Sequence, residues 1–285
     1  MTQNVRITTL VENTTSRPGL LAEHGLAFWI ECGRRRILFD TGQSGILVRN
    51  AKALGVDLAE TDAIVLSHGH YDHTGGLSAV LDIATKATVY LHPAAIEPKF
   101  SRKGLKCRPI GMPEHATEAI RSREVIQTEK PTQIFQGVTV TGQIPHINNF
   151  EDVGGVFFLD ESCQKPDDLW DDQALFFESP KGLVVVFGCA HAGVVNTLHR
   201  IADLSGRQHF YAVMGGMHLF NASTERIERT INAFRQYDVQ KIGPAHCTGV
   251  NAIARFWNVF PNRSFVCSVG VQVSAWKQTS RLGLN

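Results

Sequence analysis

Three imidazoles and one carboxylate stand within six residues of the stretch Ser67–Gly76, which reads Ser-His-Gly-His-Tyr-Asp-His-Thr-Gly-Gly. The apolar run Ala63–Leu66 comes directly before it and is typical of a buried strand. We expect a helix over Gly76–Thr85 directly after it. A rigid strand therefore leads into a loop that is rich in metal-binding side chains.

The spacing of these side chains predicts two neighbouring metal positions. In an extended segment, His68 and His70 point to the same side, whereas Asp72 and His73 lie where the chain turns into the helix. Nitrogen ligands with one carboxylate favour zinc, iron or manganese, and they do not suit calcium, which prefers oxygen ligands throughout. A solvated, histidine-rich turn is the alternative interpretation, but it leaves four ligand groups at this spacing without a reason.

The motif His-x-His-x-Asp-His resembles the signature of the metallo-β-lactamase superfamily. Within it, the chain is similar to the branch named for 7,8-dihydropterin-6-methyl-4-(β-D-ribofuranosyl)aminobenzene-5′-phosphate synthase. Further motifs carry this likeness: Glu23–Leu26, Asp72–Leu77, Thr141–Pro145, Asp172–Leu175, Gly188–His191, Gly215–Leu219 and Gly243–Gly249. The resemblance implies an αββα sandwich of two similar halves, whereas periodicity alone predicts only mixed α/β structure.

Composition narrows the choice of partners and compartment. With 43% hydrophobic residues in 285, the chain can form one domain (1–285) with a sizeable core. A formal net charge of +1 gives no field that attracts nucleic acid or an anionic membrane, so we expect a small-molecule substrate. No signal peptide or membrane-spanning run is expected, which favours the cytoplasm. Six scattered cysteines argue against a disulfide framework and fit a reducing compartment.

Histidines recur behind strands in the second half of the sequence. Apolar strands are predicted over Val184–Phe187 before His191, over Phe210–Met214 before His218, and over Lys241–Gly243 before His246. Residues far apart in the sequence can meet at one edge of a sandwich when each follows a strand end.

The resemblance implies a ligand set for two divalent ions, with zinc preferred and iron or manganese as alternatives. One ion is assigned to His68, His70 and His191, and the other to Asp72, His73 and His246. Cys189 or a water would bridge the ions or complete a shell, and His146 is a further ligand candidate.

Two aspartates are expected to have roles around the metal ions. Asp72 is expected to act as a general base besides binding metal. Asp40, at the end of the predicted strand Arg36–Asp40, either orients a ligand histidine or caps a turn; both interpretations remain open.

An inserted cap is predicted at about residues 93–136, where apolar periodicity weakens and cations gather. Lys99, Arg102, Lys103 and Arg108 are candidate contacts for an anionic substrate, unless they form an ordinary solvated face. His218, behind two glycines, is expected to touch substrate or to pack within its loop.

Three functions are compatible with these features. The first is a metal-dependent hydrolase that uses an activated water on a small, anionic ester or phosphoester. The second is a transferase of the dihydropterin and aminobenzene ribofuranosyl phosphate synthase type. The third, from a different class, is a metal-binding sensor or effector without catalysis.

Overall fold

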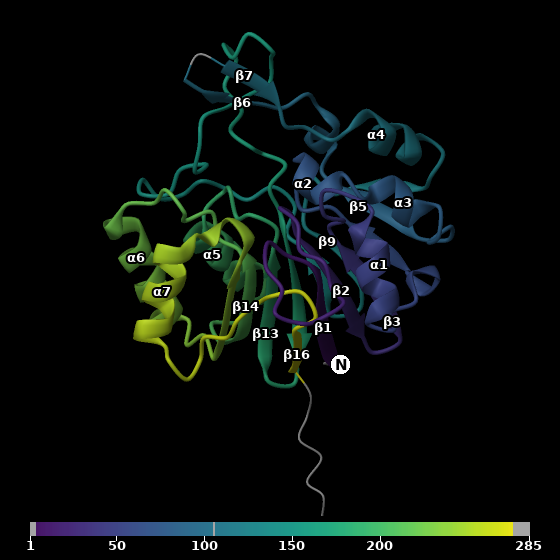
Figure 1. Cartoon of the computed structure of the whole chain (residues 1–285). Coiled ribbons are helices and arrows are strands. Elements are labelled where there is room, and N and C mark those ends of the chain that lie inside the picture. The colour runs from purple at the N-terminus through teal and green to yellow at the C-terminus, as the bar shows by residue number, and fades with distance from the viewer. Residues whose placement is uncertain (1–3, 105, 276–285) are drawn as a thin grey trace, which may run out of the picture.

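Two β-sheets pack face to face, and helices cover both outer faces, in the computed structural model that describes residues 4–104 and 106–275 (Figure 1). The layers follow the αββα order that the resemblance implied. No helix among the described residues is long and apolar enough to cross a membrane.

The first sheet contains antiparallel strands at one edge and parallel strands at the other. Its order is β16 (Gln272–Ala275), β1 (Val5–Val11), β2 (Ala27–Cys32), β3 (Arg35–Phe39), β4 (Ala63–Val65), β5 (Thr88–Leu91) and β8 (Val125–Gln127). Strands β2 and β3 form an antiparallel hairpin. Strand β4 ends directly before the histidine-rich loop.

The second sheet repeats this combination of antiparallel and parallel pairing. Its order is β15 (Lys241–Ala245), β14 (Phe210–Gly216), β13 (Gly182–Phe187), β12 (Ala174–Ser179), β10 (Val138–Val140) and β9 (Thr132–Phe135). Because β13, β14 and β15 are parallel, their carboxyl ends lie at one edge, as the sequence predicted for the strands before the histidines.

Buried side chains fill the space between the sheets and the space under each helical layer. One cluster joins the facing sides of the two sheets, with Phe28, Phe39 and Phe177 among its largest members. The first sheet is covered by α1 (Ile46–Ala53), α3 (Leu77–Leu81) and α4 (Glu114–Arg121). The second is covered by α5 (Val194–Ser205), α6 (Thr224–Gln236) and α7 (Val250–Val259). The predicted helix Gly76–Thr85 is shorter than expected, and the four-residue α2 (Tyr71–Thr74) precedes it.

The cap boundary differs from the prediction of residues 93–136. Within that range, β8 belongs to the first sheet, β9 belongs to the second, and α4 packs on α3. The cap is a small sheet of β6 (Phe100–Lys103) and β7 (Lys106–Pro109), with β11 (Phe157–Phe158) paired to β6. It projects beyond the sandwich (Figure 1). Since β11 comes from the second half of the chain, a contiguous insertion was the wrong description.

A disulfide joins the two parts of the cap, although the scattered cysteines argued against a disulfide framework. Cys107 of β7 is bonded to Cys163, which follows β11 by five residues along the chain. The spacing of 56 residues gave no local signal for this pairing. Cys189, Cys247 and Cys267 are free thiols.

Candidate metal centre

Four loops with strained backbones converge at the edge of the sandwich below the cap. Asp40 follows β3, Ala190 follows β13, His218 follows β14 and His246 follows β15, and all four have left-handed φ angles between 43° and 59°. Residues other than glycine rarely adopt this backbone conformation, and those that do are often found at functional sites. Each chain segment turns sharply here and directs side chains towards a common point.

The first group of candidate ligands consists of three buried imidazoles. The ligand atoms of His68, His70 and His191 lie within 4.8 Å of one another. His68 Nε2 faces His70 Nδ1 at 3.0 Å. The structure therefore brings together the three residues assigned to one ion.

Hydrogen bonds fix the tautomers of two of these rings. His68 Nδ1 lies 2.8 Å from Ser67 Oγ, whose own hydrogen is donated to Asp40 Oδ2, so the hydroxyl accepts from the imidazole. His191 Nδ1 donates to the carbonyl oxygen of Val153 at 2.8 Å. Each ring therefore presents an Nε2 lone pair to the site, and His191 Nε2 is buried without a hydrogen-bond partner.

The second group surrounds the carboxylate of Asp72. Its Oδ2 lies 3.2 Å from His246 Nε2 and 3.1 Å from His24 Nε2. His73 Nε2 lies 3.3 Å from His246 Nε2. Asp72, His73 and His246, assigned to the other ion, are thus also neighbours, and His24 adds an imidazole that had no predicted role.

In this second group, too, hydrogen bonds from Nδ1 orient the histidine rings. His73 Nδ1 donates to Asp40 Oδ2 at 2.7 Å, and His246 Nδ1 donates to Asn13 Oδ1 at 2.8 Å. Nε2 of both rings therefore points inward, and the role of Asp40 is to orient a histidine. Cys189 lies between the two groups, since its Sγ is 3.2 Å from His73 Nε2.

Burial sets the charge of most of these side chains. Burial, reinforced by the neighbouring imidazoles, holds the pKa values of His68 and His191 well below the usual range, so both rings are neutral. Burial also opposes ionisation of Asp72, but the hydrogen bond from His24 and the neighbouring rings of His246 and His73 hold its pKa well below the usual range. Burial lowers the pKa of His73, while Asp40 more than offsets this and raises it to about 9.

This donor set fits divalent metal ions. Imidazole nitrogens face one another at contact distance, and an ionised carboxylate lies beside them with little solvent access. Unpartnered buried nitrogens are costly unless a ligand satisfies them. The nitrogen-rich chemistry with one carboxylate suits zinc, iron or manganese.

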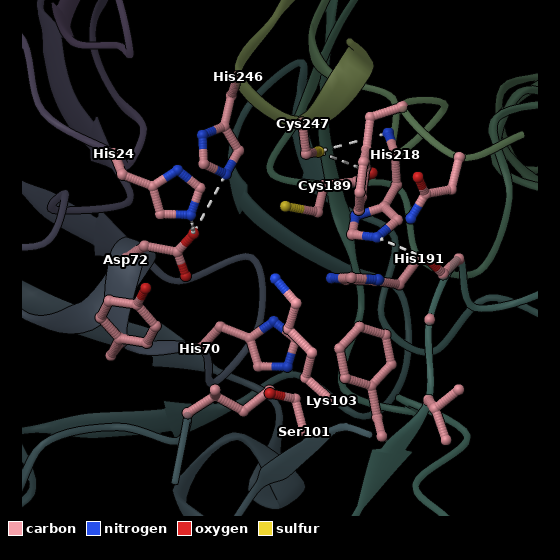
Figure 2. A pocket seen from close by; sticks show the side chains of 18 of the residues that line it. His24, His70, Asp72, Ser101, Lys103, Cys189, His191, His218, His246 and Cys247 are labelled. Atoms are coloured by element: carbon pink, nitrogen blue, oxygen red, sulfur yellow. Dashed lines mark hydrogen bonds and ion pairs between the residues drawn. The ribbon is translucent and has the colours of Figure 1, made fainter. Parts of the chain in front are cut away.

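A cavity of about 780 Å³ opens above the two groups. Arg102, Lys103 and Arg108 of the cap contribute positive charge to its lining (Figure 2 labels Lys103). Phe157 of β11 packs its ring against His70 and His191, with 5.3 Å between ring centroids in both pairs. The cap therefore forms one wall of the candidate site.

Lys99 is placed differently from the other cap cations that were expected to contact substrate. It is buried, and its Nζ lies 2.9 Å from both Asp167 Oδ2 and Asp171 Oδ1. Asp171 Oδ2 in turn accepts a hydrogen bond from the Gly69 amide in the histidine-rich loop. Because its charge is paired within the protein, we correct its expected role from substrate contact to support of the loop.

His146 does not join either group of candidate ligands. Its ring stacks on Trp170 with 4.9 Å between centroids, and the side chain is exposed. His218, by contrast, lines the cavity and packs against His191, with 4.3 Å between ring centroids.

Sequence reasoning missed three residues of the site. His24, Asn13 and Cys247 all line the cavity. His24 lies in a loop and not directly behind a strand, although it belongs to the motif Glu23–Leu26. Cys247 follows His246 directly, and this position next to a candidate ligand was the available signal.

Comparisons with known proteins agree with this geometry. A model of the metallo-beta-lactamase superfamily matches residues 21–162. The chain is 33% identical over 274 residues to the 7,8-dihydropterin-6-methyl-4-(beta-D-ribofuranosyl)-aminobenzene-5'-phosphate synthase of Methanocaldococcus jannaschii, covering 90% of this chain and 92% of the relative.

A second relative from the same organism, an uncharacterized protein, is 31% identical over 251 residues. The match covers 86% of this chain and 91% of that protein. The solved structure of Tm1679, described as a metal-dependent hydrolase of the beta-lactamase superfamily, superposes with a TM-score of 0.81 at 30% identity. That match covers 94% of this chain and 98% of Tm1679. From the motif, the fold and these relatives, the chain belongs to the metallo-β-lactamase superfamily.

Proposed function

We propose that the protein is a metal-dependent hydrolase that acts on a small, anionic ester or phosphoester. The observation that supports this most directly is that Nε2 of four imidazoles, those of His68, His73, His191 and His246, faces inward next to the ionised Asp72. Divalent ions held by these residues would supply an activated water and would polarise the bond that is cleaved.

His24 and Asp72 provide a route for protons. Asp72 Oδ2 accepts from His24 Nε2 at 3.1 Å, and the side chain of His24 is 54% exposed. The hydrogen bond to Asp72 raises the pKa of His24. In the proposed reaction, His24 Nε2 first releases its proton to solvent, Asp72 then takes a proton at Oδ2 as general base, and His24 Nε2 accepts that proton from Asp72.

The cap is proposed to bind the anionic part of the substrate. Arg102, Lys103 and Arg108 line the cavity on the side of the small sheet, while Phe157 and Phe220 give it apolar surface. A cavity of about 780 Å³ is within the range of small-molecule sites and suits a substrate with one anionic group and a ring.

A synthase-type transfer is the second candidate. It is favoured by the name of the relative that is 33% identical over 90% of this chain. The same arginines and lysine would then hold the phosphate of an aminobenzene ribofuranosyl phosphate, and the leaving group would be pyrophosphate.

The experiment that separates these candidates supplies metal-loaded protein with two sets of substrates. One set contains phosphodiesters, thioesters, lactones and β-lactams, and the other contains a dihydropterin pyrophosphate with an aminobenzene ribofuranosyl phosphate. We expect hydrolysis in the first set, and loss of it in His70→Ala. Pyrophosphate release only in the second set would favour the transferase, and metal binding without turnover of either set would favour the sensor or effector.

A further inference from the structure

Three adjacent strands of the second sheet deliver a second kind of ligand group to the cavity. β13, β14 and β15 are neighbours and run parallel. Cys189 follows the first, His218 follows the second and Cys247 follows the third (Figure 2). The two thiols thus come from the outer strands of this trio, and the imidazole comes from the strand between them.

The three side chains are close enough to share one ion. The Sγ atoms of Cys189 and Cys247 and a ring nitrogen of His218 lie within 4.8 Å of one another. The backbone amide of His218 also donates to Cys247 Sγ at 3.3 Å. Zinc forms bonds of about 2.3 Å to sulfur and about 2.0 Å to nitrogen, so small movements of the side chains would close the site.

His218 offers a nitrogen with no other partner. Its Nε2 lies 3.1 Å from the carbonyl oxygen of Gly154 and must donate to it, so Nδ1 carries the lone pair. His218 exposes only 9% of its surface, and Nδ1 is buried without a hydrogen-bond partner. A buried acceptor left unsatisfied in this way is explained by a ligand that the ring binds.

Glycine at position 216 allows the loops to approach one another. A Cβ atom on Gly216 would lie 2.8 Å from Cys247 Sγ and 2.3 Å from the carbonyl oxygen of Gly188. Any side chain there would therefore push the loops of β13 and β15 apart. The close approach of the two thiols depends on this residue.

We propose that Cys189, His218 and Cys247 form a third metal position, which is rich in thiolate and selects thiophilic ions such as Zn²⁺, Cd²⁺ or Cu⁺. It differs from the two imidazole groups in its ligand chemistry and uses Cys247 and His218, which neither of those groups contains. All three residues line the cavity, so an ion enters from that side, and a further ligand from the cavity can complete its shell. Both cysteines are free thiols and available as ligands.

Cobalt titration tests this position, because Co²⁺ bound to thiolate absorbs in the near ultraviolet whereas imidazole-bound Co²⁺ gives mainly weak visible bands. We expect the wild-type apoprotein to bind one more equivalent of Co²⁺ than Cys247→Ser does. The charge-transfer absorption should be lost together with that equivalent, because the ion that the two thiolates share is no longer held. Cys267→Ser is the matched control, since Cys267 is a buried free thiol that does not line the cavity.

Two further variants keep this test independent of the proposed hydrolase. His218→Gln should weaken binding of the thiolate-bound ion with both sulfurs still present. His70→Ala should lose a visible-band equivalent and retain the near-ultraviolet absorption. The proposal is overturned if Cys247→Ser and His218→Gln give the wild-type stoichiometry and the wild-type charge-transfer band.

Discussion

Asp40 connects the two groups of imidazoles through its carboxylate. Oδ2 accepts from His73 Nδ1 and from Ser67 Oγ, both at 2.7 Å, and Ser67 in turn accepts from His68. One buried side chain therefore fixes the tautomer of a histidine in each group. Groups that orient metal ligands typically contribute about 10- to 100-fold to metal affinity.

Replacement of Asp40 should change how metal binding depends on pH. His73 has a pKa of about 9 because Asp40 offsets the effect of burial, so protons compete with metal for this ring below that pH. In Asp40→Asn the pKa of His73 should fall. The rise of metal affinity with pH should then be complete at lower pH, while affinity at its plateau drops by about 10- to 100-fold.

Calorimetric metal titrations between about pH 6 and pH 10 would measure both effects of Asp40→Asn. Asp57→Asn is a suitable control, because Asp57 is an exposed cap of a short 3-10 helix. Identical pH dependence in wild type and Asp40→Asn would contradict the role assigned to Asp40.

His24 should affect catalysis more than metal binding. It contacts Asp72 from the solvent side, and the hydrogen bond raises its pKa. In His24→Ala we expect near-normal metal content and a kcat lowered by about 100-fold, with loss of one limb of the pH–rate profile. Metal content that falls in parallel with kcat would instead make His24 a metal ligand.

At the scale of elements, the root of the cap is tied to the histidine-rich loop by Lys99. This lysine precedes β6, and its ion pairs reach Asp167 and Asp171, the latter bonded to the Gly69 amide. Lys99→Met would leave two buried carboxylates without a cation. Breaking a buried pair in this way typically costs about 3–5 kcal/mol of unfolding free energy.

This loss of stability should depend on pH in a defined direction. Burial raises the pKa of Asp171 even beside Lys99, and removal of the ammonium should raise it further. Between the pKa of Asp171 in the unfolded state and its higher pKa in the folded state, the folded protein holds a proton that the unfolded protein releases. The free energy of unfolding of the variant therefore falls as pH rises between these two pKa values. Urea unfolding should show a larger defect at pH 8 than at pH 5, and Lys103→Met, on the exposed strand β6, should show little defect at either pH.

The cap strands should determine how strongly the substrate binds. Arg102 and Lys103 are exposed and line the cavity. The double variant Arg102→Gln/Lys103→Gln should raise KM several-fold and weaken its dependence on salt, with kcat little changed. Arg121→Gln, an exposed change on α4, is the control. Unchanged salt dependence of KM in the double variant would show that Arg102 and Lys103 are solvated surface residues that do not bind the substrate.

At the scale of the whole molecule, the sequence predicted those features that depend on residues close together along the chain. Apolar runs followed by histidines located the strands and the loops behind them, so residues from both halves were correctly expected at one edge. The cap was harder, because β11 joins β6 across more than fifty residues and the disulfide Cys107–Cys163 has no local signature. His24 was missed because its place beside Asp72 depends on how a loop crosses the site.

Metal analysis tests the central claim, that the strand ends form a two-ion centre. The protein would be purified from cells supplied with divalent metal, and its metal content would be measured by plasma emission. We expect His191→Ala and His246→Ala each to lose about one ion per chain relative to wild type, and the double variant to lose about two. Variants that fold and retain the wild-type metal content would contradict it.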